Sequence, residues 1–226
     1  MSPQQSKSSR AEKSAAKERV AAMRAEEARR ERRQKLLIYG VAGLVVVLIA
    51  ALVAYQMVQQ GEEEDRLAAD IEGLQEFEIA DREHVAGAVD YEAEYGTNPP
   101  AGGNHAESPQ WQNCGIYDTP IGSENAVHSL EHGAVWITYQ PDLPEDQVEA
   151  LRDVVRDLDS SESDYVIVSP FEGLTSPVVA SAWGLQVSVD DPSDERLDQF
   201  LHQYVRGPQT LEPGAACQGG VGSPIE

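Results

Sequence analysis

The chain has 226 residues, of which 17 are Lys or Arg and 39 are Asp or Glu, so its net charge at neutral pH is −22. Residues 1–35 carry eleven basic and five acidic residues, whereas residues 59–226 carry six arginines and 34 acidic residues. A domain of such negative charge repels the phosphates of nucleic acids, which argues against nucleic-acid binding. The contrast between the two ends indicates that they lie in different environments.

Residues 36–58 contain no charged side chain and are long enough to cross a bilayer core of about 30 Å as a helix. Residues 10–35 have the composition of a charged helix that leads into this span. The positive-inside rule predicts that residues 1–35 are a basic cytoplasmic segment and that the acidic domain lies outside the cell membrane. A cleaved signal peptide is the alternative, but its apolar region and its charged leader are both shorter.

Beyond the span, residues 59–76 are predicted to be an acidic juxtamembrane spacer, residues 77–217 an extracytoplasmic domain and residues 218–226 a flexible tail. Within the domain, residues 98–105 read NPPAGGNH and cannot form regular structure. The prolines lack backbone donors, and the glycines allow positive φ angles. We expect this stiff loop to hold His105 in a fixed place.

A short helix is predicted at residues 123–133, between a serine that can cap its start and a glycine that can end it. On this helix Glu124, His128 and His132 share one face, and Glu131 follows His128 by three residues. Two histidines at this spacing can bind one metal ion, because their rings lie one turn apart. The alternative is a polar face without a ligand.

The second half of the domain shows regular periodicity. Strands are predicted at residues 134–139, 165–168 and 178–189, and helices at residues 144–158 and from Ser193 onward. The order β-α-β-β-α predicts an α+β fold, in which a small sheet carries its helices on one face.

The two cysteines, Cys114 and Cys217, both follow the apolar span. An even number of cysteines in an oxidising compartment predicts a disulfide. The alternatives are a pair of metal thiolates or a redox pair, but the spacing is not the C-x-x-C of redox pairs.

Several longer motifs resemble a known family. They are His84-Val with Tyr91, PPAGGNH at 99–105, WQNCGIYD at 111–118, ENAVHSLEHG at 124–133, PDLP at 141–144 and AWG at 182–184. These motifs resemble the bacterial membrane-anchored family catalogued as domain of unknown function 3105, over about residues 77–217. The resemblance implies an extracytoplasmic location and supplies no activity.

Most of the histidines fall in these motifs: His84, His105, His128 and His132. Imidazole suits copper and zinc ions. No methionine follows Met57, which disfavours a methionine-rich Cu(I) site and favours Cu(II) or Zn(II). Glu124 or Glu131 could be a further ligand, an outer partner of a ligand, or a base.

Three functions fit these residues. The first is an anchored domain that binds copper or zinc, with His105, His128 and His132 converging on one site and His84 as a further candidate. The second is a structural or interaction module of the cell envelope, in which the histidines hydrogen-bond to the Pro-Gly loop. The third is a metal-dependent enzyme with Glu131 as base. The sequence has no G-x-S-x-G, H-E-x-x-H or P-loop motif to support other enzymes.

Overall fold

The computed structural model describes residues 3–226, with side chains from residue 17 onward. The chain divides into two compact units, residues 1–62 and residues 63–226. The positions of the two units relative to one another are not determined, and each is therefore described by itself.

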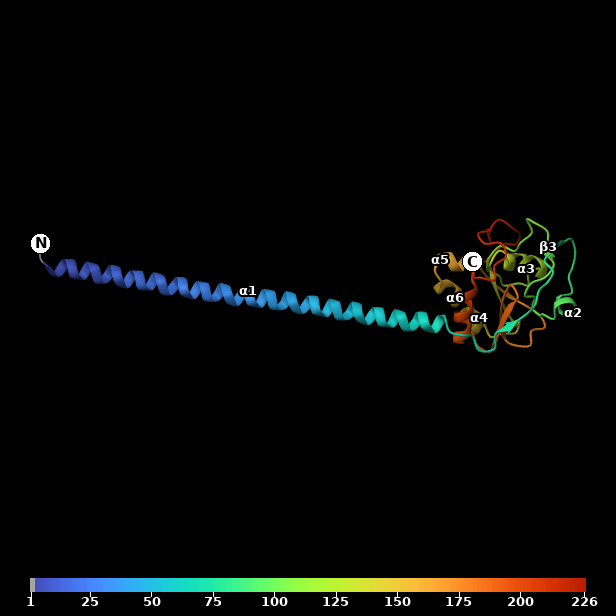
Figure 1. Cartoon of the computed structure of the whole chain (residues 1–226), viewed down its shortest axis with the longest axis horizontal. Helices are drawn as coiled ribbons and strands as arrows, with labels where there is room; N and C mark the ends of the chain where they lie inside the picture. The colour runs from blue at the N-terminus through green and yellow to red at the C-terminus, as the bar shows by residue number, and fades with distance from the viewer. Residues whose placement is uncertain (1–2) are drawn as a thin grey trace. The chain divides into compact units, whose positions relative to one another are not determined.

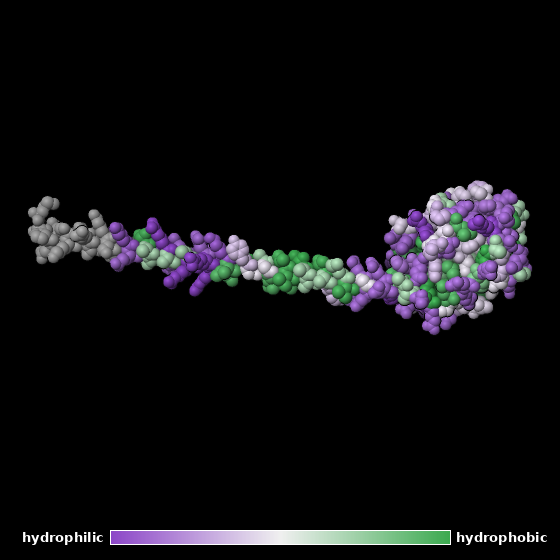
Figure 2. All heavy atoms as spheres, in the orientation of Figure 1, coloured by the Kyte–Doolittle hydropathy of each residue, from purple (hydrophilic) through white to green (hydrophobic). Residues whose placement is uncertain are grey.

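The first unit lies almost wholly within helix α1, Pro3–Leu67. From Lys17 to Leu67 this helix is long and apolar enough to cross a membrane, as predicted for residues 36–58. Figure 2 shows an apolar band along the helix with hydrophilic residues on both sides of it. The apolar side chains of this band are exposed, which suits a lipid environment and not the core of a soluble domain. The helix therefore suggests membrane association.

The second unit is a mixed α/β domain built around a six-stranded sheet of order β1-β8-β7-β5-β6-β4. Its strands are β1 Gln75–Glu76, β4 Gly115–Ile116, β5 Val135–Tyr139, β6 Val166–Pro170, β7 Val178–Ala182 and β8 Leu185–Val189. A separate two-stranded sheet consists of β2 His84–Val85 and β3 His105–Ala106. The helices are α2 Tyr91–Tyr95, α3 Ser123–Glu131, α4 Glu145–Asp157, α5 Ser160–Ser163 and α6 Glu195–Tyr204.

The sheet is mixed. Strand β6 runs parallel to both β5 and β4, while β7, β8 and β1 continue the sheet from β5 in antiparallel pairs. The predicted β-α-β-β-α segment therefore forms only part of this sheet, and α5 interrupts its order. Residues 178–189 form two strands, which turn at Gly184 with a φ of 72°.

Helices α4 and α6 cover one face of the sheet, here called the α4/α6 face. Val135, Ile137, Val166 and Val168 point to this face and are almost fully buried. The helices contribute apolar residues at helical spacing, namely Val148, Leu151, Val155, Leu197, Phe200 and Leu201. Burial of each such side chain stabilises the fold by about 1.5–3 kcal/mol. Most of these side chains are aliphatic, so this face forms a mainly aliphatic core.

The opposite face is covered by α3 and irregular segments, and is here called the α3 face. Trp136 and Ile167 alternate with the residues above and pack against Ala126, Val127 and Leu130 of α3. In Figure 1 the labels α4, α5 and α6 gather on one side of the domain, and α2, α3 and β3 on the other. The prediction of helices on one face only was therefore wrong. Helix α3 was itself predicted, but its place on the second face was not, because helical spacing does not show which face of a sheet a helix covers.

Two helix starts also differ from the prediction. Helix α3 begins after Gly122 without a side-chain cap, so the serine at 123 lies inside the helix. Asp194, and not Ser193, caps α6 by accepting a hydrogen bond from the backbone of Arg196. Gly133 follows α3 with a φ of 99°, as its role at the helix end requires.

Both flanking segments make specific contacts with the domain. In the spacer 59–76, Arg66 forms an ion pair with Asp198 at 2.6 Å, and Ile71 joins the α4/α6 core. In residues 218–226, predicted as a flexible tail, the backbone of Ile116 bonds to Ile225 and Glu226. This segment therefore lies along the free side of β4.

Candidate metal centre

Three histidines and one glutamate come together on the α3 face. We call His84, His105, His128 and Glu131 the His–Glu group. One potential ligand atom from each residue lies within 4.8 Å of all the others. Three of the four residues are buried. They come from three separate segments, so tertiary structure and not local sequence brings them together.

The two short strands supply the first pair. Strands β2 and β3 are parallel, with His84 opposite His105. Side chains opposite each other in a ladder point to the same face. Their ring centroids are accordingly 4.7 Å apart.

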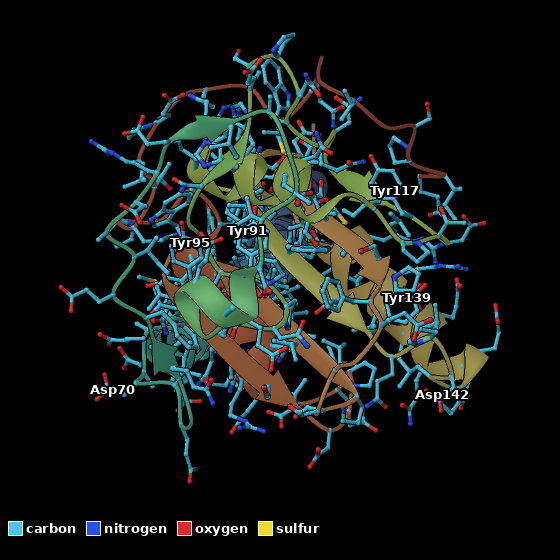
Figure 3. The ribbon with its side chains drawn as sticks, turned by 90° about the vertical axis from the view of Figure 1, so that its right-hand side faces the viewer. Asp70, Tyr91, Tyr95, Tyr117, Tyr139 and Asp142 are labelled. Carbon is cyan, nitrogen blue, oxygen red and sulfur yellow. A yellow bond between two sulfur atoms is a disulfide. The ribbon has the colours of Figure 1, made fainter. Side chains whose placement is uncertain are left out.

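The Pro-Gly loop holds His105 in place. The hydroxyl of Tyr91 donates to the carbonyl of Asn104 at 2.8 Å, and the N–H of Asn104 donates to the Tyr95 hydroxyl at 3.1 Å. Figure 3 shows these tyrosines close together on α2, where their ring centroids are 6.0 Å apart. Gly103 has a φ of 114°, and a Cβ there would lie 2.4 Å from the Tyr95 ring. The stiff loop predicted from the sequence therefore depends on a glycine at this position.

Helix α3 supplies the other pair. His128 and Glu131 are three residues apart, so they are neighbours on the helix surface that faces β3. The ring of His128 lies 4.9 Å from that of His84 and 5.0 Å from that of His105. The hydroxyl of Ser129 helps to hold the helix in place by donating a hydrogen bond to the carbonyl of Gln112 at 2.7 Å.

His105 is hydrogen-bonded at both ring nitrogens. Nδ1 lies 2.8 Å from the carbonyl of Gly103, and Nε2 lies 3.0 Å from Oε2 of Glu131. A carbonyl can only accept, so Nδ1 carries a proton and Nε2 is the nitrogen that faces the group. Histidine ligands of metals are commonly oriented by such a bond to a backbone carbonyl.

The charges of the group are coupled. Burial by itself lowers the pKa of His105, but its hydrogen bonds to Glu131 and Gly103 outweigh burial and raise that pKa. Burial likewise raises the pKa of Glu131, but the hydrogen bond from His105 prevails and lowers it. Both shifts have the same cause, the contact of His105 Nε2 with Oε2 of Glu131, and both favour the charged forms of the two side chains.

His128 is neutral at physiological pH. Its burial, followed by the charges of His132 and His105, lowers its pKa to about 4. Among the described residues no partner meets ordinary hydrogen-bond geometry at its buried Nδ1, while a contact with the backbone of Ala106 opposes the lowering of its pKa. A neutral imidazole with an unpaired buried nitrogen has the state that a metal ligand requires.

His132 and Glu124 occupy other positions. Nδ1 of His132 lies 2.8 Å from the carbonyl of Ala216, and its Nε2 lies 3.7 Å from Glu212. His132 is thus a neighbour of His128, with ring centroids 4.8 Å apart, but it lies outside the His–Glu group. Glu124 accepts a hydrogen bond from the backbone of Val89. Glu131, which the sequence analysis kept open as a ligand, an outer partner or a base, lies inside the group.

The predicted disulfide between Cys114 and Cys217 is confirmed, with Cα atoms 5.5 Å apart. It joins the loop before α3 to the segment that receives the hydrogen bond of His132. Both cysteines are therefore used in the crosslink and supply no thiolate to a metal. This leaves nitrogen and oxygen as the donor atoms of the site.

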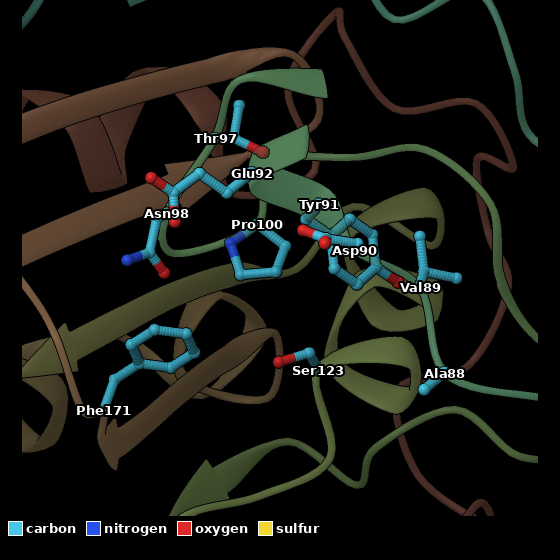
Figure 4. Close-up of a pocket in the computed structure, with 10 residues that line it drawn as sticks. All are labelled: Ala88, Val89, Asp90, Tyr91, Glu92, Thr97, Asn98, Pro100, Ser123 and Phe171. Carbon is cyan, nitrogen blue, oxygen red and sulfur yellow. The ribbon is translucent and has the colours of Figure 1, made fainter. Parts of the chain in front are cut away.

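A separate cavity of about 450 Å³ lies near the start of α3 (Figure 4). Ser123, Phe171, Pro100 and Asn98 are among the residues that line it. None of the residues of the His–Glu group lines this cavity. The candidate metal centre is therefore a cluster of side chains and not part of this larger pocket.

Comparisons with known proteins place these features in a family. A family model described as an inhibitor of host cell division protein domain matches residues 14–70, a range that ends before the His–Glu group. No curated protein and no solved structure matched the chain. A second family model matches residues 85–219, which include His105, His128 and Glu131 and begin one residue after His84. As its motifs predicted, the chain belongs to the family described as Protein of unknown function (DUF3105).

Proposed function

We propose that this protein is a membrane-anchored extracytoplasmic domain that binds one transition metal ion, Cu(II) or Zn(II), through His84, His105, His128 and Glu131. The observation that carries the proposal is the His–Glu group itself, whose four ligand atoms lie within 4.8 Å of one another. Ligands of a tetrahedral Zn(II) site are about 3.4 Å apart, so small side-chain movements would close this group around an ion.

The donor set indicates the class of metal. Three imidazoles and one carboxylate offer nitrogen and oxygen, which suit Zn(II) and Cu(II). Soft ligands for Cu(I) are missing from the described domain, because its cysteines are in a disulfide and no methionine follows Met57. The carboxylate of Glu131 would offset part of the positive charge of a divalent ion in this buried place.

The anchor and the disulfide support the extracytoplasmic location that we propose for the domain. Eleven basic residues precede the apolar part of α1. After it there are only six, and 34 acidic residues outnumber them. This asymmetry supports a cytoplasmic N-terminus. A disulfide is stable in an oxidising compartment outside the cytoplasm. Both features support an acidic domain, with its His–Glu group, outside the cell membrane.

The rival reading is a structural or interaction module without metal. The hydrogen bonds of His105 to Gly103 and of His132 to Ala216 favour it, because they tie loops together. A structural module does not explain why the ring of His128 is buried. Apart from a backbone contact with Ala106, this buried ring has only other histidine rings beside its unpaired Nδ1, an arrangement that is unfavourable without an ion. A bound ion would remove that defect, so the metal-binding function accounts for more of the site.

The experiment is calorimetric titration of the full-length protein in detergent micelles with Zn(II) and, separately, with Cu(II). The protein carries a tag without histidine and is first stripped of metal. We expect one ion per chain, and at least a hundredfold weaker binding in His128→Ala, because that variant removes a central ligand.

His202→Ala is the matched control, because His202 is an exposed histidine on α6. Its affinity for metal should equal that of the unmodified protein. Failure of the unmodified protein to bind either ion, or equal binding by His128→Ala, would contradict the proposed function and favour the structural module.

A further inference from the structure

The four residues of the His–Glu group differ sharply in their access to solvent. The side chain of His84 is 42% exposed, whereas those of His105 and Glu131 are 0% and 6% exposed. His128 is buried as well. A structural metal site is usually closed on all sides, so one exposed ligand among three buried ones needs an explanation.

Aromatic side chains enclose the buried members of the group. Trp183 lies edge-on to the ring of His105, with centroids 5.8 Å apart. Trp111 stands at 5.8 Å from the ring of His128 and at 5.1 Å from that of His132. These rings cover His105 and His128, and the exposed imidazole of His84 marks the open side of the group.

The supports of the ligands differ in the same way. His105 is held by the tyrosine-clamped loop, and His128 and Glu131 are on a helix. His84, like His105, is on a strand of two residues, but an irregular segment and not a clamped loop adjoins it. Its Nε2 lies 3.9 Å from Oε2 of Glu131, which is too far for a hydrogen bond. Its ring contacts those of His105 and His128, but it can turn toward solvent without breaking a hydrogen bond to Glu131.

We propose that the ion is exchangeable cargo and that His84 is the ligand past which it enters and leaves. The inference rests on the proposed function, and it distinguishes a metal carrier from a domain stabilised by a permanent ion. His105, His128 and Glu131 would set the affinity, and His84 the rate of exchange. In the exchange, an incoming nitrogen or oxygen donor binds the ion as the bond to His84 breaks, without any change in oxidation state.

The charge of the domain indicates the form in which the metal arrives. Residues 59–226 carry 34 acidic residues against six arginines, so the field around the domain attracts free hydrated cations and repels anionic metal complexes. The substrate of this carrier is therefore the free divalent ion. A protein that takes the ion away would need a positively charged surface around its own ligands.

The test measures the release of Zn(II) from the loaded full-length protein in micelles after mixing with an excess of a coloured chelator. For the unmodified protein we expect a release rate that increases with chelator concentration, because the chelator attacks the ion at the open side. His84→Ala should release the ion at least tenfold faster and also take it up faster, so that affinity changes less than the release rate.

His202→Ala serves as the exposed-histidine control and should release the ion at the unmodified rate. Near-ultraviolet circular dichroism checks that His84→Ala is folded, and His84→Gln repeats the test with a polar side chain. Release that is independent of chelator concentration, or unchanged in both His84 variants, overturns the carrier inference while leaving the metal site intact. Absence of any bound Zn(II) or Cu(II) overturns the proposed function and the inference with it.

Discussion

The two faces of the sheet are stabilised by different means. The α4/α6 face is a mainly aliphatic core, formed by two amphipathic helices on alternating strand residues. The α3 face has one short helix, and the rest of its cover consists of aromatic rings, hydrogen-bonded loops and a disulfide. Irregular backbone can place polar groups where regular elements cannot, but it buries less apolar surface per residue. The face that carries the His–Glu group therefore depends on a crosslink that the other face does not have.

The largest expected effect comes from removing the crosslink of the α3 face. The cysteines are 103 residues apart in the sequence, so the disulfide closes a long loop in the unfolded chain. Replacing both, Cys114→Ser with Cys217→Ser, should lower the free energy of unfolding by about 4–5 kcal/mol. Denaturant titration in micelles measures this change.

Reduction of the unmodified protein should reproduce the loss, and reduction of the double variant should have no effect. A loss below about 1 kcal/mol would mean that the loops of the α3 face are held by their noncovalent contacts alone, since a disulfide of this loop length contributes more. The contrast between the two faces would then be weaker than we describe.

A matched pair of leucines tests the two faces directly. Leu130 of α3 and Leu151 of α4 are both fully buried, one on each face. Truncation of either to alanine should lower the free energy of unfolding by about 2–5 kcal/mol. Only Leu130→Ala should also weaken metal binding. Leu130 is next to Glu131 on α3, and the cavity left by the smaller alanine would let this helix shift.

Calorimetric titration at a temperature where both variants are folded separates the two effects. Equal loss of metal affinity in Leu130→Ala and Leu151→Ala would show that the site depends on the stability of the whole domain. In that case the two faces do not act separately.

The smallest expected effect is a dependence of stability on pH that originates on the α3 face. The pKa of His128 is lowered from 6.5 to about 4, so between these values the unfolded chain binds a proton that the folded chain does not. Stability of the metal-free protein should therefore rise with pH across this range, by at most about 3 kcal/mol.

Neighbouring groups modify this slope. The lowered pKa of Glu131 adds stability that is lost as pH falls through it, whereas the raised pKa of His105 adds stability below pH 6.5 that is lost as pH rises through it. Replacement His128→Asn should flatten the profile between pH 4 and 6.5, and His202→Asn should not. Thermal unfolding across this pH range measures both variants. If His128→Asn and His202→Asn give the same dependence of stability on pH, the role of His128 is contradicted.

The same contrast explains what could be predicted from the sequence. Strands β5 and β6 and helix α4 were evident because apolar residues such as Val148, Leu151 and Val155 repeat with the period of the element that they form. The disulfide followed from the number of cysteines and the compartment. These signals are local or compositional, and tertiary packing did not change them.

The His–Glu group was less accessible to such reasoning. Helical spacing correctly placed His128 and His132 near each other, but it could not show which side of the helix meets β3. The structure turns His132 toward Ala216, which is 84 residues away, and brings Glu131 into the group instead. The pairing of His84 with His105 depends on two strands of two residues each, which are too short to leave a periodic pattern.

The ends of the main sheet have a consequence for how the domain meets other copies of itself. Both outer strands, β1 and β4, are only two residues long, and the segment ending at Glu226 bonds to the backbone of Ile116 on β4. A long free edge would offer backbone donors and acceptors to the sheet of an adjacent chain. The short, partly covered edges therefore leave little backbone through which two copies of the acidic domain could join their sheets.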